Sequence, residues 1–265
     1  MKRVLAINGS PRDGNTLAAL REAEKVLTGD GDIEFELIKL HEMDISMCSG
    51  CFACLKHGIG KCPLNDDMPD ILERMMSADG IIFASPVYVM GVTGLFKNFL
   101  DRLASICHRP VFCDKYAMVL STVGAIGLGD TLKYMAGAVG SWQFRKVIKA
   151  GIKTPYAYDT DKNMTAGKRA SISRRVLRFR NMMLEDKYCS PSLPQVLQFR
   201  FQRAVFTRQA DDWPADGRFY EALRGKKYYC DVKVNPLINA VGAAAEWIAG
   251  WMMKSGNEEG KGDNR

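Results

Sequence analysis

Residues 8–16, Asn-Gly-Ser-Pro-Arg-Asp-Gly-Asn-Thr, decide the fold of this chain because they join two segments of different character. The preceding residues 3–7 form a short apolar run that is typical of a buried strand. The following residues 17–23, Leu-Ala-Ala-Leu-Arg-Glu-Ala, have the composition and spacing of a helix, and Asn15 or Thr16 is the expected N-cap. The sequence therefore predicts a turn from a strand into a helix.

Such a turn directs unpaired backbone N–H groups and the positive end of a helix dipole towards one point, where a phosphate can bind. Ser10, Asn15 and Thr16 add side-chain donors, and Arg12 adds a positive charge. The stretch has neither the G-x-x-x-x-G-K-[ST] pattern of nucleoside-triphosphate loops nor the G-x-G-x-x-G pattern of dinucleotide-binding loops. We expect a single phosphomonoester, such as that of a mononucleotide. The alternative is an ordinary turn that binds nothing.

Strands and helices alternate as far as about residue 160. Strands are predicted at 34–39, 80–84, 116–121 and within 145–153, and helices at 66–76, 95–103 and 130–140. Strands this continuously apolar predict a parallel sheet with helices on both faces. Ligands of such sheets bind beyond the carboxyl ends of the strands. Three polar or glycine-rich loops are expected there, at residues 9–16, 85–91 and 122–127.

Beyond residue 160 the alternation stops. A basic helix is predicted over 166–185, an extended and partly irregular segment over 188–229, and a helix over 236–254. Asn239 and Glu246 interrupt the last helix, so we expect it to pack on the core or on a second subunit and not to span a membrane; an interfacial helix is the alternative. The predicted organisation is a domain at 1–160, an extension at 161–254 and a disordered polar tail at 255–265.

The composition is that of an ordinary globular protein, with 47% hydrophobic and 25% charged residues among 265. Much of the net charge of +7 lies in residues 168–180, which we interpret as a solvated helix face because no recognised nucleic-acid module accompanies it. No run approaches the ~20 apolar residues of a membrane span, and no signal-peptide pattern opens the sequence. We therefore expect a cytoplasmic protein without a nucleic-acid partner.

Four of the eight cysteines follow the spacing C-x2-C-x2-C-x7-C: Cys48, Cys51, Cys54 and Cys62. We predict that this segment is a loop. Compact C-x2-C-x2-C runs with a fourth cysteine nearby are typical of iron–sulfur cluster ligation. Zinc, a redox-active dithiol and four thiols without a ligand are alternatives that the spacing leaves open. The other four cysteines are scattered, and we expect them to be small core residues: Cys107, Cys113, Cys189 and Cys230.

Three motifs in this order resemble the iron–sulfur flavoproteins, which belong to the flavodoxin-like, NAD(P)H-dependent FMN reductase superfamily. The first is Gly-Ser-Pro-Arg followed by Gly-Asn-Thr at residues 9–16, and the second is the cysteine segment leading into Asp-Asp-Met at 66–68. The third is Ser-Pro-Val-Tyr at 85–88, followed by Lys97 and by Asp-Arg at 101–102. The resemblance covers residues 1–160.

The resemblance implies a flavodoxin-like three-layer α/β/α fold with a five-stranded parallel sheet in the order 2-1-3-4-5, plus a C-terminal, mostly helical or irregular extension. It implies that FMN binds at the strand ends, with its phosphate on the first loop and its ring between the second and third. The implied FMN-binding residues are Ser10, Pro11, Arg12, Asn15, Thr16, Ser85, Pro86, Val87, Tyr88, Thr122 and Gly124. The four clustered cysteines would hold a [4Fe–4S] cluster. Lys97, Asp101 and Arg102 would be structural or dimer-forming.

The expected function is that of an FMN-dependent oxidoreductase. Hydride from NADH or NADPH would pass to the flavin, and electrons would pass through the cluster to a quinone, a protein or a small-molecule acceptor. No catalytic side chain is expected, because His41, His57 and His108 form no motif. The alternatives are an electron-transfer flavoprotein reduced by a ferredoxin-like partner, and a zinc-stabilised flavin-binding sensor or scaffold. We expect a homodimer or homotetramer, in which the extension covers the flavin or reaches across the dimer.

Overall fold

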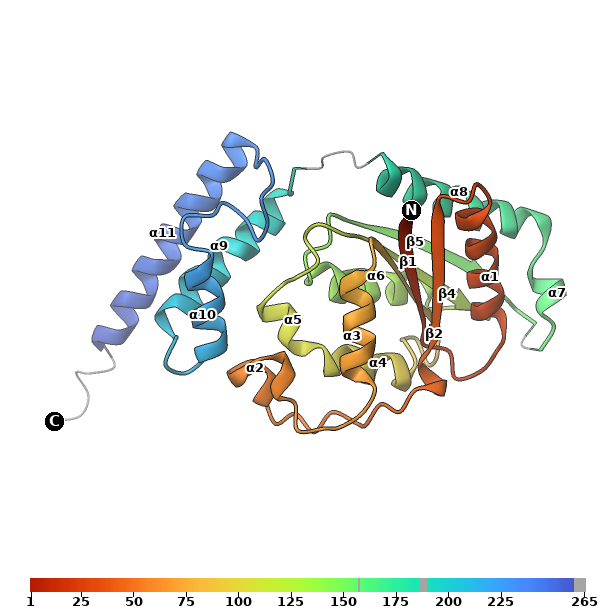
Figure 1. Cartoon of the computed structure of the whole chain (residues 1–265), viewed down its shortest axis with the longest axis horizontal. Coiled ribbons are helices and arrows are strands. Elements are labelled where there is room, and N and C mark those ends of the chain that lie inside the picture. Colours follow the sequence, from red (N-terminus) through yellow and green to blue (C-terminus); the bar gives the residue numbers. More distant parts are fainter. Residues whose placement is uncertain (157, 186–189, 260–265) are drawn as a thin grey trace. The chain divides into compact units, whose positions relative to one another are not determined.

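The computed structural model describes residues 1–156, 158–185 and 190–259 (Figure 1). The described chain forms two compact units. The first consists of residues 1–51, 64–104 and 111–187, and the second consists of 52–63, 105–110 and the residues from 188 onward. Each unit has its own packing.

Five strands form one parallel sheet in the first unit, in the order β2-β1-β3-β4-β5, which confirms the predicted topology. Their bounds are β1 Lys2–Asn8, β2 Ile33–Lys39, β3 Gly80–Pro86, β4 Tyr116–Val123 and β5 Lys146–Lys153. The register pairs Asn8 with Ala84 and Pro86 with Thr122. The loops that leave β1, β3 and β4 therefore begin at the same edge of the sheet.

Helices cover both faces of this sheet, with α1 and α8 on one face and α3, α4 and α6 on the other (Figure 1). The helices of the first unit are α1 Asn15–Thr28, α3 Met68–Ser77, α4 Gly94–Arg102, α6 Leu128–Gly140, α7 Thr160–Asn163 and α8 Ala166–Leu184, with a 3-10 turn, η1, at Leu40–Glu42. The short helix α5, Ala104–His108, begins in this unit. The three-layer α/β/α prediction is confirmed.

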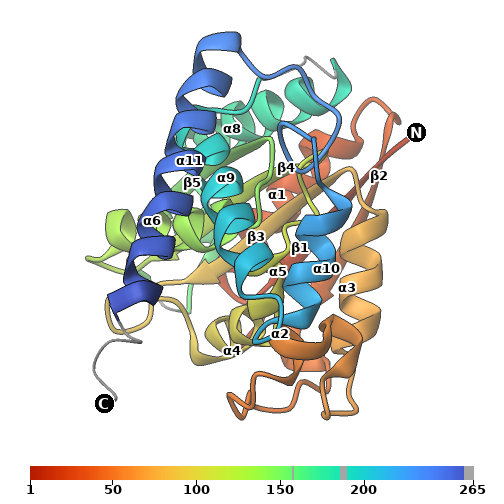
Figure 2. The same ribbon diagram turned by 90° about the vertical axis from the view of Figure 1, so that its left-hand side faces the viewer.

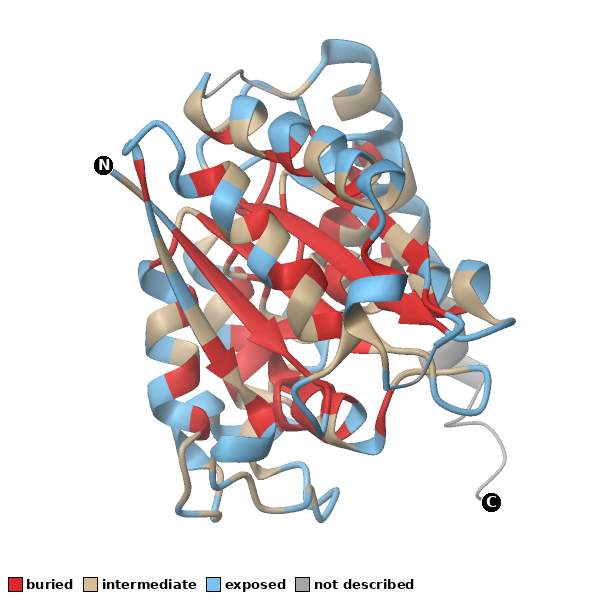
Figure 3. Ribbon diagram, turned by 90° about the vertical axis from the view of Figure 1, so that its right-hand side faces the viewer, coloured by how far each residue is buried: buried red, intermediate tan, exposed pale blue. Residues whose placement is uncertain are grey.

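The core follows the two-residue alternation of the strands. Ile82 and Ala84 point towards α1 and α8, whereas Phe83 points to the other face, with its ring centre 6.4 Å from that of Phe99 on α4. Because both faces are covered, every residue of β4 is buried, and Figure 3 shows the central strands in red. In the edge strand β2, by contrast, Ile33 and Ile38 are buried, whereas Glu34 and Glu36 are exposed.

Helix α8 belongs to the core of the first unit, so this unit extends beyond residue 160, where the sequence placed the domain boundary. Its residues Ile172, Val176, Phe179 and Met183 are buried against α1 and the sheet. A Cβ on Gly80 of β3 would lie only 2.7 Å from the Phe179 ring, which shows how closely α8 approaches the strand. The arginines of the basic segment 168–180 lie mainly on the exposed face of the same helix.

The second unit is helical (Figure 2). Its elements are α2 Ala53–His57, the 3-10 turn η2 Ile59–Lys61, most of α5, α9 Leu193–Arg208, α10 Pro214–Ala222 and α11 Pro236–Glu259. The prediction of an extended, irregular segment over 188–229 is wrong, because α9 and α10 lie there. The prediction of a loop across the cysteine segment is also wrong, since α2 and η2 interrupt it.

The last helix is longer than predicted, because α11 continues through residues 255–259, which the sequence assigned to a disordered tail. The remaining tail, 260–265, and Cys189 lie outside the described residues. Of the other scattered cysteines, Cys113 is buried, as expected, whereas Cys107 and Cys230 are half-buried. Within the described ranges no helix combines the length and apolarity needed to cross a membrane.

Candidate functional site

A cavity of about 120 Å³ opens at the carboxyl edge of the sheet in the first unit. Its lining residues come from the ends of β3 and β4, from the start of α1 and from the loops after β1, β3, β4 and β5: Ser10, Arg12, Gly14, Asn15, Thr16, Pro86, Val87, Tyr88, Thr122, Gly124, Thr154 and Pro155. These loops meet because parallel strands end at one edge. Of the eleven predicted FMN-binding residues, all but Pro11 and Ser85 line this cavity, hereafter the strand-end cavity.

Contacts with Thr93 and Phe96, and hydrogen bonds within the loop itself, fix the loop after β1. The Thr93 hydroxyl donates a 2.6 Å hydrogen bond to the Gly9 carbonyl, and a Cβ on Gly9 would lie 2.7 Å from Phe96. The Ser10 N–H donates to Asn8 Oδ1 at 3.0 Å, and the Ser10 hydroxyl donates to the Arg12 carbonyl at 2.7 Å. These contacts within the protein fix the shape of the loop, which reduces the ordering cost of binding a ligand.

The first turn of α1 offers donors to this cavity. Gly14 is the N-cap, and not Asn15 or Thr16 as the sequence suggested, and no side chain of the described residues caps the helix. The first N–H groups of a helix have no partner within the helix, and they carry the positive end of its dipole. The side-chain nitrogen of Asn8 is buried without an acceptor among the described residues. A phosphate group fits the N–H groups at the start of α1.

Asn15 and Thr16 connect this turn to its neighbours. Thr16 and Thr122 are both buried, and their hydroxyl oxygens are 2.8 Å apart, which links α1 to the end of β4. Asn15 donates to the Tyr156 carbonyl at 3.3 Å and accepts from the Asn163 side chain at 3.0 Å. Asn163 and Tyr156 were not among the predicted site residues, and neither were the two lining residues that follow β5. The signal for these two was available, because a polar Thr-Pro pair follows a strand that ends at the same edge.

The cavity is electropositive. Arg12 is the one charged residue among the described residues that line it, and its guanidinium carbon lies 5.2 Å from the centre of the Tyr158 ring. The neighbouring acid, Asp13, is engaged by Lys39, with 2.7 Å between the Lys39 nitrogen and the carboxylate. Hydrogen bonds with Asp13 and Glu42 raise the pKa of Lys39 above its usual value. Arg12 is thus available for an anionic ligand.

The loop after β3 ends in a tight turn. The backbones of Tyr88 and Gly91 exchange two hydrogen bonds of 2.9 and 3.0 Å, and the central residues Val89 and Met90 have φ values of 45° and 66°. A β-branched residue rarely adopts this left-handed conformation, so the turn is strained at Val89, whose side chain is fully exposed. Ser85, in contrast, is buried, and its hydroxyl donates to the Pro86 carbonyl at 3.0 Å. Ser85 therefore stabilises this loop and does not line the cavity.

The cysteine segment is anchored to α4 at its start. The Cys48 N–H donates to Asn98 Oδ1 at 2.9 Å, and Asn98 and Arg102 both donate to the Ser46 carbonyl. Arg102 also forms a buried ion pair with Asp66. Among the described residues, no three His, Cys, Asp or Glu side chains are gathered closely enough to hold a metal ion.

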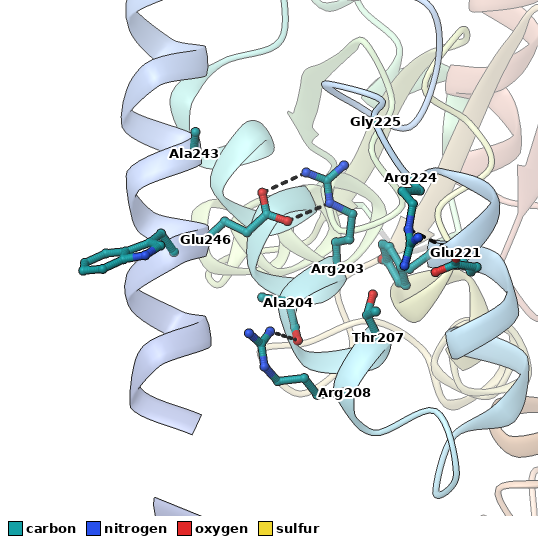
Figure 4. Close-up of a pocket in the computed structure, with 11 residues that line it drawn as sticks. Arg203, Ala204, Thr207, Arg208, Glu221, Arg224, Gly225, Ala243 and Glu246 are labelled. Carbon is teal, nitrogen blue, oxygen red and sulfur yellow. Dashed lines mark hydrogen bonds and ion pairs between the residues drawn. The ribbon is translucent and has the colours of Figure 1, made fainter. Parts of the chain in front are cut away.

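A larger hollow of about 450 Å³ lies between α9, α10 and α11 in the second unit (Figure 4). Its arginines are engaged by the protein itself: Arg203 binds Glu246 at 2.7 Å and Arg224 binds Glu221 at 3.1 Å. Arg208 donates to the Ala204 carbonyl of its own helix at 3.0 Å. Since these charges are satisfied locally, this hollow is a weaker ligand site than the smaller strand-end cavity.

Comparisons with known proteins concern the family and the fold of this chain. The sequence profile of a family described as NADPH-dependent FMN reductase matches residues 2–153. The chain is 45% identical over 101 residues to an iron–sulfur flavoprotein of Methanocaldococcus jannaschii, which covers 38% of this chain and 51% of the relative. It is 28% identical over 213 residues to an iron–sulfur flavoprotein of Clostridioides difficile, covering 78% of this chain and 90% of the relative.

A solved structure of an NADH:FMN oxidoreductase in its apo form is similar in fold. It superposes with a TM-score of 0.53 at 22% identity, over 68% of this chain and 89% of the other. At this identity the similarity concerns the fold alone. The alignments with the first curated relatives span 48–63% of those proteins' own length.

Proposed function

Because the chain belongs to the NADPH-dependent FMN reductase family, we propose that it is an FMN-dependent oxidoreductase that takes hydride from NADH or NADPH. The observation that carries the proposal is the uncapped N-terminus of α1, which faces an electropositive cavity at the strand ends. Its electron acceptor would be a quinone, a protein or a small molecule.

The chain's own residues would bind and orient the cofactor. The N–H groups of the first turn of α1 and the Arg12 guanidinium are the phosphate donors. The cavity of about 120 Å³ is smaller than the roughly 300–1,000 Å³ of a pocket that encloses a whole ligand. It therefore suits the phosphate end of FMN, while the flavin ring would lie over Pro86–Tyr88 and Gly124 at the mouth.

FMN, once bound, supplies hydride acceptance and the release of one or two electrons. The chain is then not required to provide a nucleophile or a general base. Arg12 and Tyr88 are the titratable side chains among the described residues that line the cavity. What the protein contributes is a preorganised anion site and a set of loops that fix the position of the ring.

We propose the [4Fe–4S] cluster as a separate property of the four clustered cysteines. It is supported by their C-x2-C-x2-C-x7-C spacing and by the iron–sulfur flavoprotein names of the relatives. The segment would order around the cluster, because metal binding and local folding are commonly coupled.

The first test is purification without oxygen, followed by flavin, iron and sulfide analysis and anaerobic titration with NADH and NADPH. We expect one FMN per chain and bleaching of the flavin absorbance by at least one nicotinamide. About four iron and four sulfide per chain would support the cluster, as a cubane with four thiolates requires. Protein that binds no FMN after reconstitution would overturn the proposed function. Reduction by ferredoxin alone would instead favour an electron-transfer flavoprotein.

Arg12→Met tests the phosphate role. Charge-assisted hydrogen bonds contribute about 1.5–3 kcal/mol, so we expect FMN affinity to fall by roughly 10- to 100-fold. Riboflavin, which lacks the phosphate, should bind with unchanged affinity. Arg21→Met removes the same charge from an exposed position on α1 outside the cavity and is the matched control. Equal losses for FMN and riboflavin would show that Arg12 contacts the ring or supports the fold instead.

A further inference from the structure

The inner face of α11 packs against α9. A Cβ on Gly242 would lie 2.7 Å from Val196, and one on Gly250 would lie 2.5 Å from Arg208, so the two helices are closely packed. Glu246 is the one charged residue in the sequence from 236 to 252. It binds Arg203 and Arg200 of α9 at 2.7 and 2.8 Å, and Figure 4 shows the pair with Arg203. The inner face therefore fixes α11 within the second unit.

The outer face of α11 has the opposite character. Large apolar side chains recur there every three or four residues, and each is about half exposed or more. This outer stripe consists of Leu237 (78% exposed), Val241 (51%), Trp247 (72%), Ile248 (48%), Trp251 (61%) and Met252 (61%), with exposed Ala240 and Ala244 between them.

The size of the outer stripe is unusual for a monomer. If a fully exposed large apolar side chain offers roughly 200 Å², these exposed fractions amount to roughly 740 Å². The largest apolar patch on a typical monomer is about 300–600 Å². A standard protein–protein interface takes about 800 Å² from each partner. The stripe thus matches in size what one subunit contributes to a stable dimer.

We propose that the outer stripe of α11 binds the outer stripe of a second copy of this chain. The two helices run antiparallel about a two-fold axis that passes near Ala244, the midpoint between Leu237 and Trp251. A stripe without charges is self-complementary, as a two-fold interface requires. Its spacing of three and four residues, with apolar side chains at 237, 240, 244, 247 and 251, is that of a seam between paired helices.

Side-chain size favours the antiparallel arrangement. It places Trp247 opposite Val241, Trp251 opposite Leu237 and Ile248 opposite Ala240, so each larger residue of the C-terminal half meets a smaller one. A parallel pair would place Trp251 opposite Trp251 and Ala240 opposite Ala240. The helices would then be held apart at one end and leave a void at the other, which close packing disfavours.

A membrane surface fits the stripe less well. Interfacial helices carry lysine and arginine on a polar face that remains in water. Residues 236–252 contain neither residue type, and the face opposite the stripe is packed on α9. The chain's own C-terminal residues 260–265, Gly-Lys-Gly-Asp-Asn-Arg, have no large apolar side chain with which to cover the stripe. A second copy supplies the required apolar surface.

The first experiment compares the mass of the full chain with that of the double variant Val241→Glu/Ile248→Glu by sedimentation at micromolar concentration. We expect the mass to fall by a factor of two, from dimer to monomer or from tetramer to dimer. Leu177→Glu, at an exposed leucine of α8, is the matched control and should keep the wild-type mass. A monomeric wild type, or an assembly unaffected by the double variant, would overturn the proposal. Far-UV circular dichroism and FMN content verify folding.

Cysteine cross-linking tests the register without disrupting the stripe. Under mild oxidation, Ala244→Cys should form a disulfide between copies. Leu237→Cys should form one only when it is mixed with Trp251→Cys, and the wild type reports the background from the eight native cysteines. Self-cross-linking of Leu237→Cys would overturn the antiparallel pair. The proposal would also be overturned if the wild type and the double variant had the same mass and only the wild type bound phosphatidylcholine–phosphatidylglycerol vesicles.

Discussion

Replacing Gly124 with valine is expected to lower the affinity for FMN at least 100-fold while the apoprotein stays folded. Gly124 lines the strand-end cavity, and a Cβ there would meet no heavy atom within 4 Å, so the apoprotein has room for the new side chain. Its φ is not in the left-handed region, so the backbone accepts a branched residue. The isopropyl group would instead occupy the space that we assign to the flavin ring. A 100-fold loss corresponds to about 2.8 kcal/mol of binding free energy.

Gly129→Val is the matched control for this experiment. Gly129 lies in the first turn of α6, where a Cβ would also meet no heavy atom within 4 Å, but it does not line the cavity. Titration of both apoproteins with FMN, followed by quenching of the flavin fluorescence, measures the affinities, and thermal unfolding verifies the fold. If Gly124→Val bound FMN as tightly as the wild type, the loop after β4 would not contact the ring.

The strands of the sheet could be predicted because their signal is local. Residues 80–84 and 116–121 are continuous apolar runs, and the structure buries them on both faces. The first loop was equally clear, since a strand, a glycine-containing turn and a helix follow one another within a few residues. The order of the strands in the sheet could not be predicted from a local signal. It came from the resemblance to flavoproteins, because no periodicity states which strands are neighbours.

The parts of the site that the sequence missed depend on contacts between distant residues. Asn163 donates to Asn15, which is 148 positions away in the sequence, and α7 has no pattern that indicates this contact. The turn at Val89 and Met90 contradicts local preference, since glycine or asparagine is expected at left-handed positions. Strained turns of this kind occur at functional sites, and the conformational propensities of the residues do not predict them.

Helix α9 was missed for a related reason. Its residues Gln-Phe-Arg-Phe-Gln-Arg at 198–203 alternate polar and apolar side chains, which is not the pattern of a helix with one apolar face. In the structure, Arg200 and Arg203 are largely buried because Glu246 of α11 neutralises them. The start of α9 did carry a local signal, a capping box between Ser192 and Gln195.

The largest effect on stability is expected from Asp66→Ala. The side chains of Asp66 and Arg102 are 0% and 3% exposed, and Asp66 also accepts the Ser46 N–H at 3.0 Å and the Met68 N–H at 3.2 Å. Removal of the carboxylate leaves a buried guanidinium without its counter-charge, which costs about 3–5 kcal/mol. Urea unfolding measures the loss. Asp101→Ala breaks the exposed pair with Lys97 and should cost at most about 1 kcal/mol. Similar losses in both variants would contradict the structural role of Asp66.

The same pair makes a prediction about pH. The hydrogen bonds from Arg102 hold the pKa of Asp66 below its usual value of 3.8 in the folded protein. A carboxyl whose folded pKa is depressed contributes stability above its unfolded pKa and loses it as the pH falls through the folded value. The difference in unfolding free energy between the wild type and Asp66→Asn should therefore be constant near neutral pH and shrink below about pH 4. A difference that did not change with pH would show that Asp66 acts through packing and neutral hydrogen bonds, since an asparagine can provide both.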